Sequence, residues 1–143
     1  MRSKLLQQDP QRTYMLVFEP GDEVIPPLMD FARAHRLHSC RVMGIGGFSR
    51  VTLGYFDMNA LAYKEIPVEE QVEVVSLLGN IALYENEPRL HAHVLIGRSD
   101  GSAMGGHLLD ATVQPTLEVM LMETPTPLER TKDSITGLPL LVP

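Results

Sequence analysis

Tryptophan is absent from this 143-residue chain, cysteine occurs once, and aromatic residues make up only 6% of it. A single cysteine, Cys40, excludes an intrachain disulfide framework, and its place inside a predicted strand indicates a small buried side chain rather than a reactive thiol. With so few aromatic rings, Val, Leu, Ile and the eight Met residues must fill the hydrophobic core. The composition therefore predicts an aliphatic core without disulfide support.

Clustered positive charge and long apolar runs are also missing. The twelve Lys and Arg residues are scattered, and the net charge is −6 with a pI near 5.3. Binding to a phosphate backbone depends on clustered Lys and Arg, so the sequence carries no nucleic-acid footprint of its own. Before Pro10 the only apolar run is Leu5-Leu6. We therefore expect neither a secretory signal nor a membrane span, and a cytoplasmic protein.

Length and composition predict one globular domain over residues 1–143. Hydrophobic residues make up 44% of the chain and charged residues 21%, which is typical of ordinary soluble domains. A helix is predicted over about residues 22–36, because Asp22 can cap it and apolar residues recur along one stripe. Residues 1–11 are expected to form a loose segment, and residues 124–143 an extended tail with a short edge strand at its end.

Strand patterns occupy the rest of the chain. Alternating apolar residues, or short apolar runs bounded by turns, indicate strands at residues 12–19, 39–43, 50–56, 61–66, 70–75, 76–84, 89–97 and 112–123. The glycine-rich stretch 44–47 lacks the helix that should follow a phosphate loop, so we interpret it as a bulge or a close approach of strands. One helix with seven or more strands predicts an α+β fold: a mainly antiparallel, curled β-sheet with the helix packed on it.

Three of the five histidines lie close together in the sequence. His91 and His93 are two apart in a predicted strand, so their side chains point to the same face. Residues 98–102 carry turn chemistry that can fold the next strand back and bring His107 alongside, and Gly105-Gly106 permit a close backbone approach there. Three converging imidazoles make an open site for a transition metal. The same spacing also occurs in strands whose histidines only face water or a subunit contact.

Four charged side chains could complete such a site. Asp110 and Glu118 could accept the second N–H of an imidazole and fix its tautomer, although each could instead be a solvated strand residue. Arg50 and Arg89 could hold an anionic ligand, but we favour ion pairs with Glu across a subunit boundary. No Ser has His and acidic partners at a recognisable spacing, so a hydrolase triad is not supported.

Five motifs stand in a characteristic order and spacing. They are GIGGFSRVTLGY at 44–55, VVSLLGNI at 74–81, LHAHV at 90–94, DGSAMGGHL at 100–108 and PTLEV at 115–119. Together they resemble the plants-and-prokaryotes-conserved (PPC) domain, which occurs alone in prokaryotes and after AT-hooks in plant nuclear-localised proteins. The resemblance covers about residues 12–142. It implies an α+β fold and a homotrimer packed through its sheets.

Prokaryotic members that stand alone are commonly described as DNA-binding proteins, a description inherited from plant relatives whose DNA contact lies in the AT-hook. This sequence has no AT-hook: its only Gly-Arg step is Gly97-Arg98, in the histidine strand. The plant motif for partner contact aligns with residues 70–75, where only Glu73 and the apolar character remain. The resemblance therefore implies a regulatory module that acts through protein association rather than by reading DNA directly.

The resemblance also supports the metal site. The prokaryotic form keeps His91, His93 and His107, as metal-containing members do, whereas the plant domains have other residues there. This implies one transition-metal ion per chain, with zinc as the default and iron, nickel or copper accepted by the same ligands. The expected partners are further copies of the chain, forming the homotrimer, and a protein partner or small ligand, with no membrane.

A metalloenzyme is the alternative function. Three histidine ligands leave one coordination position for water, whose pKa a zinc ion lowers to about 7. The sequence identifies no general base and no group of residues that would bind a substrate. We therefore favour a non-enzymatic, metal-binding protein.

Overall fold

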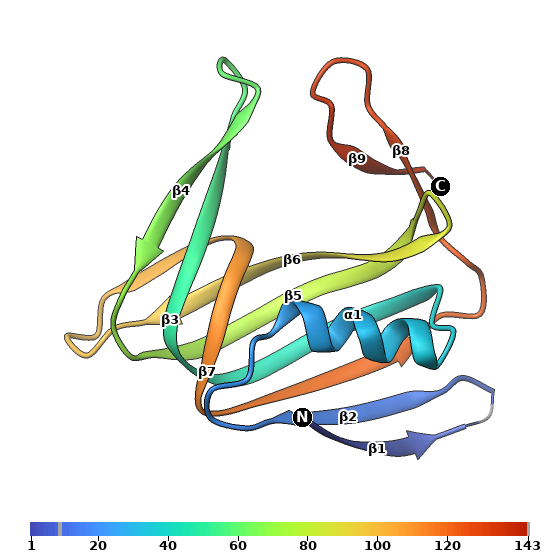
Figure 1. Cartoon of the computed structure of the whole chain (residues 1–143), viewed down its shortest axis with the longest axis horizontal. Helices are drawn as coiled ribbons and strands as arrows, with labels where there is room; N and C mark the ends of the chain where they lie inside the picture. Colours follow the sequence, from blue (N-terminus) through green and yellow to red (C-terminus); the bar gives the residue numbers. More distant parts are fainter. Residues whose placement is uncertain (9, 143) are drawn as a thin grey trace.

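One β-sheet accounts for most of the computed structural model, which describes residues 1–8 and 10–142 (Figure 1). Its elements are β1 (Arg2–Gln7), β2 (Thr13–Phe18), α1 (Ile25–Ala34), β3 (Ser39–Asp57), β4 (Ala62–Val68), β5 (Val72–Tyr84), β6 (Glu87–Gly97), β7 (Ala103–Glu123), β8 (Glu129–Lys132) and β9 (Pro139–Val142). The strand order is β1-β2-β7-β3-β5-β8-β9, with β4 beside β3 and β6 paired to both β5 and β7. Of these pairs, β5–β8 is parallel and the others are antiparallel. The predicted α+β class is confirmed.

The sheet curls because four of its strands pair in a closed circuit. β3 pairs with β5 and β7, and β6 pairs with the same two strands. β3 is 19 residues long and β7 is 21, and register shifts at bulges let them bend. One shift lies between Gly44 and Gly46. The glycine-rich stretch is therefore a bulge within β3, as the sequence predicted.

Helix α1 packs across one face of the sheet (Figure 1). It buries Leu28 and Phe31, in agreement with the predicted apolar stripe, but it is shorter than the predicted range 22–36. The predicted cap is wrong: Asp22 accepts a hydrogen bond from the Glu19 N–H (3.0 Å), and no side chain caps the helix. Two prolines in the first turn lack N–H groups, so this helix start has fewer donors for a cap to satisfy.

Val, Leu and Ile make up most of the core between α1 and the sheet, as the composition predicted. The predicted contribution of the eight Met residues is wrong: only Met29 among them is buried, and Phe18 and Phe48 are fully buried instead. The largest fully buried side chains of the core are Phe18, Phe48, Leu16, Leu28, Leu37, Leu53, Leu77, Ile81, Ile96, Leu117, Leu121 and Val24. Cys40 is also buried, and burial raises the pKa of its thiol to about 12. The thiol is therefore protonated and unreactive at neutral pH.

The two ends of the chain are more regular than the sequence predicts. Residues 2–7, for which a loose segment is predicted, form β1 and pair with β2; all six are exposed, so no buried apolar face marks them. In the tail, β9 agrees with the predicted edge strand, whereas β8 has no counterpart in the prediction. Residues 9 and 143 of the predicted domain lie outside the described residues. Within the described chain, no helix is long and apolar enough to cross a bilayer.

Candidate metal site

The three histidines come together where β6 pairs with β7. Along β6, His91 and His93 are exposed while Ala92 and Val94 are buried, so both rings leave the same face of the strand. His93 lies directly opposite His107 in the β6–β7 register. The strand period and the turn after β6 thus place all three imidazoles on one side of the sheet.

The distances between the rings suit a shared ligand. The ring centroid of His91 lies 5.3 Å from the centroid of His93 and 5.3 Å from that of His107. The centroids of His93 and His107 are 5.6 Å apart. One nitrogen from each ring lies within 4.8 Å of the other two. Nitrogens bound tetrahedrally to zinc at about 2.0–2.1 Å lie roughly 3.4 Å apart. Small rotations of the side chains would therefore bring the rings to binding distance.

Glycines bring the neighbouring strands close to the histidines. A Cβ on Gly79 of β5 would lie 2.3 Å from the His91 carbonyl oxygen. A Cβ on Gly106 would lie 2.9 Å from the Gly54 carbonyl oxygen. Both contacts are with backbone, which cannot move aside as a flexible side chain can. The site thus depends on glycines both in the flanking strand β5 and in β7, the strand that carries His107.

Burial and positive neighbours keep two of the imidazoles neutral. The pKa of His107 is lowered to about 4, mainly by burial and further by repulsion from Arg89 and from the other two histidines when these are protonated. The pKa of His91 is lowered by burial, then by Arg130 and His93. The neutral form is the one that binds metal. His107 Nδ1 is also buried without a hydrogen-bond partner among the described residues. In the tautomer that leaves this nitrogen unprotonated, a cation would satisfy its lone pair, so the donors fit a metal ion.

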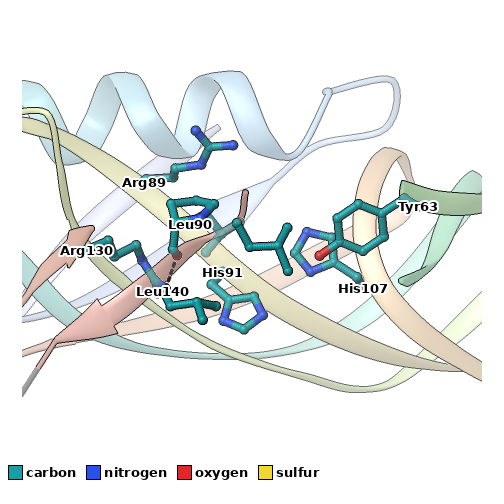
Figure 2. Close-up of a pocket in the computed structure, with 9 residues that line it drawn as sticks. Tyr63, Arg89, Leu90, His91, His107, Arg130 and Leu140 are labelled. Carbon is teal, nitrogen blue, oxygen red and sulfur yellow. Dashed lines mark hydrogen bonds between the residues drawn. The ribbon is translucent and has the colours of Figure 1, made fainter. Parts of the chain in front are cut away.

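A small cavity opens beside the histidines (Figure 2). Its volume is about 120 Å³, and His91, His107, Tyr63 and Arg130 are among the residues that line it. The Tyr63 ring stacks on His107 with centroids 4.9 Å apart. Arg130 enters from β8, in the tail. A small molecule in this cavity would contact two of the three histidines.

The other predicted site residues lie elsewhere. Asp110 forms an exposed ion pair with Arg50 at 2.9 Å, within the chain and not across a subunit boundary. Glu118 lines a separate apolar depression on the sheet. Among the described residues, neither carboxylate hydrogen-bonds a histidine. Arg89 has no acidic partner in the described chain; its guanidinium lies over the Tyr84 ring, 5.4 Å from the centroid.

Three residues beside the histidines carry no signal in the sequence: Tyr63, Asn80 and Arg130. Asn80 lies opposite His91 in the β5–β6 register, and its Oδ1 accepts a hydrogen bond from Arg130 Nη2. Arg130 reaches it because β8 runs parallel to β5 over two residue pairs. A contact between residues fifty apart, through so short a pairing, has no local pattern that could predict it.

Comparisons with known proteins relate this geometry to one family. The sequence profile of the Plants and Prokaryotes Conserved domain matches residues 6–125. The chain is similar to a Pyrococcus horikoshii protein described as plant- and prokaryote-conserved, with 31% identity, TM-score 0.86, and 99% of this chain and 95% of that chain covered. No curated protein matches the chain.

Two further solved structures are similar over nearly their whole length. A Bacteroides thetaiotaomicron protein, described as a candidate DNA-binding protein, is 28% identical with TM-score 0.90, covering 98% of this chain and 96% of that chain. An Archaeoglobus fulgidus protein, described as metal-containing, is 27% identical with TM-score 0.85, covering 99% of this chain and 97% of that chain.

Proposed function

The chain belongs to the Plants and Prokaryotes Conserved domain family, and from this premise we propose that it is a protein that holds one transition-metal ion per chain on His91, His93 and His107. The observation that carries the proposal is the convergence of three imidazole nitrogens within 4.8 Å. Zinc is the first choice, because it accepts three imidazoles and can keep a further position open. When bound, the ion would supply Lewis acidity to whatever occupies that position. The metal-containing relative from Archaeoglobus supports the same conclusion.

The role we propose for this protein is regulatory, through association with other proteins and with copies of itself. The sheet carries an apolar face made by Ile45, Val75 and Leu78, which are 59%, 55% and 51% exposed and line one depression. A contiguous apolar patch of this kind on a soluble protein usually marks an interaction surface. In this proposal the face packs against other copies to form a homotrimer.

Direct reading of DNA is not part of the proposal, although the Bacteroides relative carries that description. The net charge of −6 repels a phosphate backbone. Many of the arginines in the described chain are also neutralised by acidic partners within it: Arg2, Arg12, Arg33, Arg50 and Arg98. Among the described residues, five of the nine guanidinium groups are therefore already paired with a carboxylate.

A metalloenzyme is the second candidate, and one observation favours it. The cavity of about 120 Å³ reaches His91 and His107, so a small molecule could lie beside a bound ion. Tyr63, stacked on His107, would add a hydroxyl that can donate or accept a hydrogen bond. The residues that line the cavity include no Asp or Glu that could act as a general base.

Metal content tests the proposal directly. We would measure it by elemental mass spectrometry on untagged protein purified without chelator or nickel resin. We expect about one zinc or other transition-metal ion per chain, lost in His91→Ala and kept in His38→Ala, which removes an exposed histidine outside the group. A folded protein without metal, or equal metal in both variants, would contradict the proposal.

A further inference from the structure

The cavity beside the histidines contains a buried positive charge without an acidic partner. Arg130 is only 7% exposed. Its terminal nitrogens donate to Asn80 Oδ1 and, at 3.2 Å, to the Pro139 carbonyl oxygen, whereas its Nε has no partner among the described residues. Figure 2 shows Arg130 at one end of the cavity. Both acceptors are neutral, and within residues 1–8 and 10–142 no ion pair includes Arg130. Burying a guanidinium without a counter-charge costs folding free energy, and a bound anion would reduce that cost.

The residues around Arg130 do not compensate its positive charge; they add to the positive potential in the cavity. The pKa of Arg130 is lowered by burial and by the nearby charge of Arg89. Arg89 lines the same cavity, although its side chain extends toward α1 in Figure 2. No Asp or Glu is among the described residues that line the cavity, so its charged lining residues, Arg89 and Arg130, both carry positive charge.

The size and lining of the cavity narrow the class of anion. A cavity of about 150 Å³ accepts a molecule the size of benzene, so about 120 Å³ suits one of roughly five non-hydrogen atoms. Leu90, Leu138 and Leu140 form apolar parts of its wall. An apolar wall favours an anion with a short hydrocarbon part over a phosphate, which is polar on all sides. Tyr63 also lines the cavity, and its hydroxyl has no hydrogen bond to another described residue.

We infer that this cavity binds a small organic carboxylate, with its charge compensated by Arg130 and its hydrocarbon part against the leucines. The inference deepens the proposed function, because His91 and His107 line the same cavity, but the anion site itself needs no metal. Arg130 and the leucines at 138 and 140 lie beyond the family profile, which ends at residue 125. The tail of this chain, rather than the segment that defines the family, therefore supplies the anion-binding group.

Propionate is the probe, and its neutral counterpart propionamide is the control. Binding of each would be measured by isothermal titration calorimetry at pH 7 and constant ionic strength, on metal-free and on zinc-loaded protein. We expect metal-free protein to bind propionate at least about tenfold more tightly than propionamide, since a hydrogen bond to a charged group contributes about 1.5–3 kcal/mol. Equal affinities, or no binding of propionate, would overturn the inference. Inorganic phosphate that binds more tightly than propionate would overturn it as well.

Two variants locate the bound anion. Arg130→Gln should weaken propionate binding about tenfold or more, whereas Lys132→Gln removes an exposed positive charge from the same strand and should leave it unchanged. Arg130→Gln removes a contact that holds β8, so Leu140→Phe is the second variant: it enlarges a side chain of the cavity wall and keeps the guanidinium. We expect Leu140→Phe to reduce the space for propionate and to weaken its binding about tenfold or more. Unchanged affinity in both Arg130→Gln and Leu140→Phe would overturn the inference.

The propionate titration and the measurement of metal content can succeed or fail independently of each other. Propionate bound by metal-free protein supports the carboxylate site even if no zinc is found. Zinc bound on the histidines without any propionate binding would leave the proposed function in place and reject the carboxylate site.

Discussion

Gly79→Ala tests how the backbone positions the histidine strand. The added Cβ would lie 2.3 Å from the His91 carbonyl oxygen and 2.8 Å from both the Cα and the Cβ of Ala92. No side-chain rotation relieves these contacts, so β5 and β6 must separate at the point where the ligand strand is held. Overpacking that moves backbone costs about 2–3 kcal/mol. For a chain of this size, that lowers Tm by roughly 6–15 °C.

Gly97→Ala is the matched control for this change. Gly97 lies in β6 itself, and a Cβ there would meet its nearest neighbour, a Val75 methyl group, at 3.4 Å, which is an ordinary contact. Both variants would be followed by thermal unfolding and by zinc titration of metal-free protein. We expect Gly79→Ala to lose stability and to bind zinc about tenfold more weakly, and Gly97→Ala to resemble the unmodified protein in both respects. Equal effects of the two substitutions would refute the argument that close strand approach positions the site.

Two further predictions follow from the lowered pKa values and from the apolar face. The imidazoles must be neutral to bind metal, and burial lowers the pKa of His107 to about 4 and also lowers the pKa of His91. Protons therefore compete for these two ligands only below the ordinary imidazole value of about 6.5, and zinc should still be bound at that pH. Zinc content after dialysis at stepped pH measures this, and complete loss by about pH 6.5 would contradict it. If the proposed homotrimer forms through the apolar face, Leu78→Glu should convert it to monomer in analytical ultracentrifugation, whereas Ile135→Glu, which charges an exposed residue of the tail, should not. If both variants sediment as the unmodified protein does, the apolar face is not the interface.

The parts of the site that follow local rules could be predicted from the sequence. The period of two in a strand places His91 and His93 on one face, and the turn after β6 accounts for His107. The aliphatic core and the bulge at the glycine-rich stretch also follow from composition and turn chemistry. Each of these inferences uses residues that are neighbours along one strand or across one hairpin.

Features that depend on distant pairing could not be predicted. β1 has no buried face, so only its backbone pairing with β2 reveals it. Asp110 and Glu118 were reasonable partners for imidazole by residue type, but their positions depend on the bulged register between β3 and β7. Arg130 gives no signal at all, because its environment is formed by strands far away in the sequence.

The buried guanidinium also determines how the two proposed sites would influence each other. The positive charge of Arg130 acts on the histidine site, because it lowers the pKa of His91. The same charge disfavours a metal cation there, although it favours the neutral imidazoles that the cation needs. A carboxylate beside Arg130 would compensate this charge and remove the repulsion. Since coupling between two binding events is reciprocal, any factor by which the carboxylate tightens zinc binding must equal the factor by which zinc tightens carboxylate binding. The tail that carries Arg130 would then set the metal affinity of a site to which it contributes no ligand.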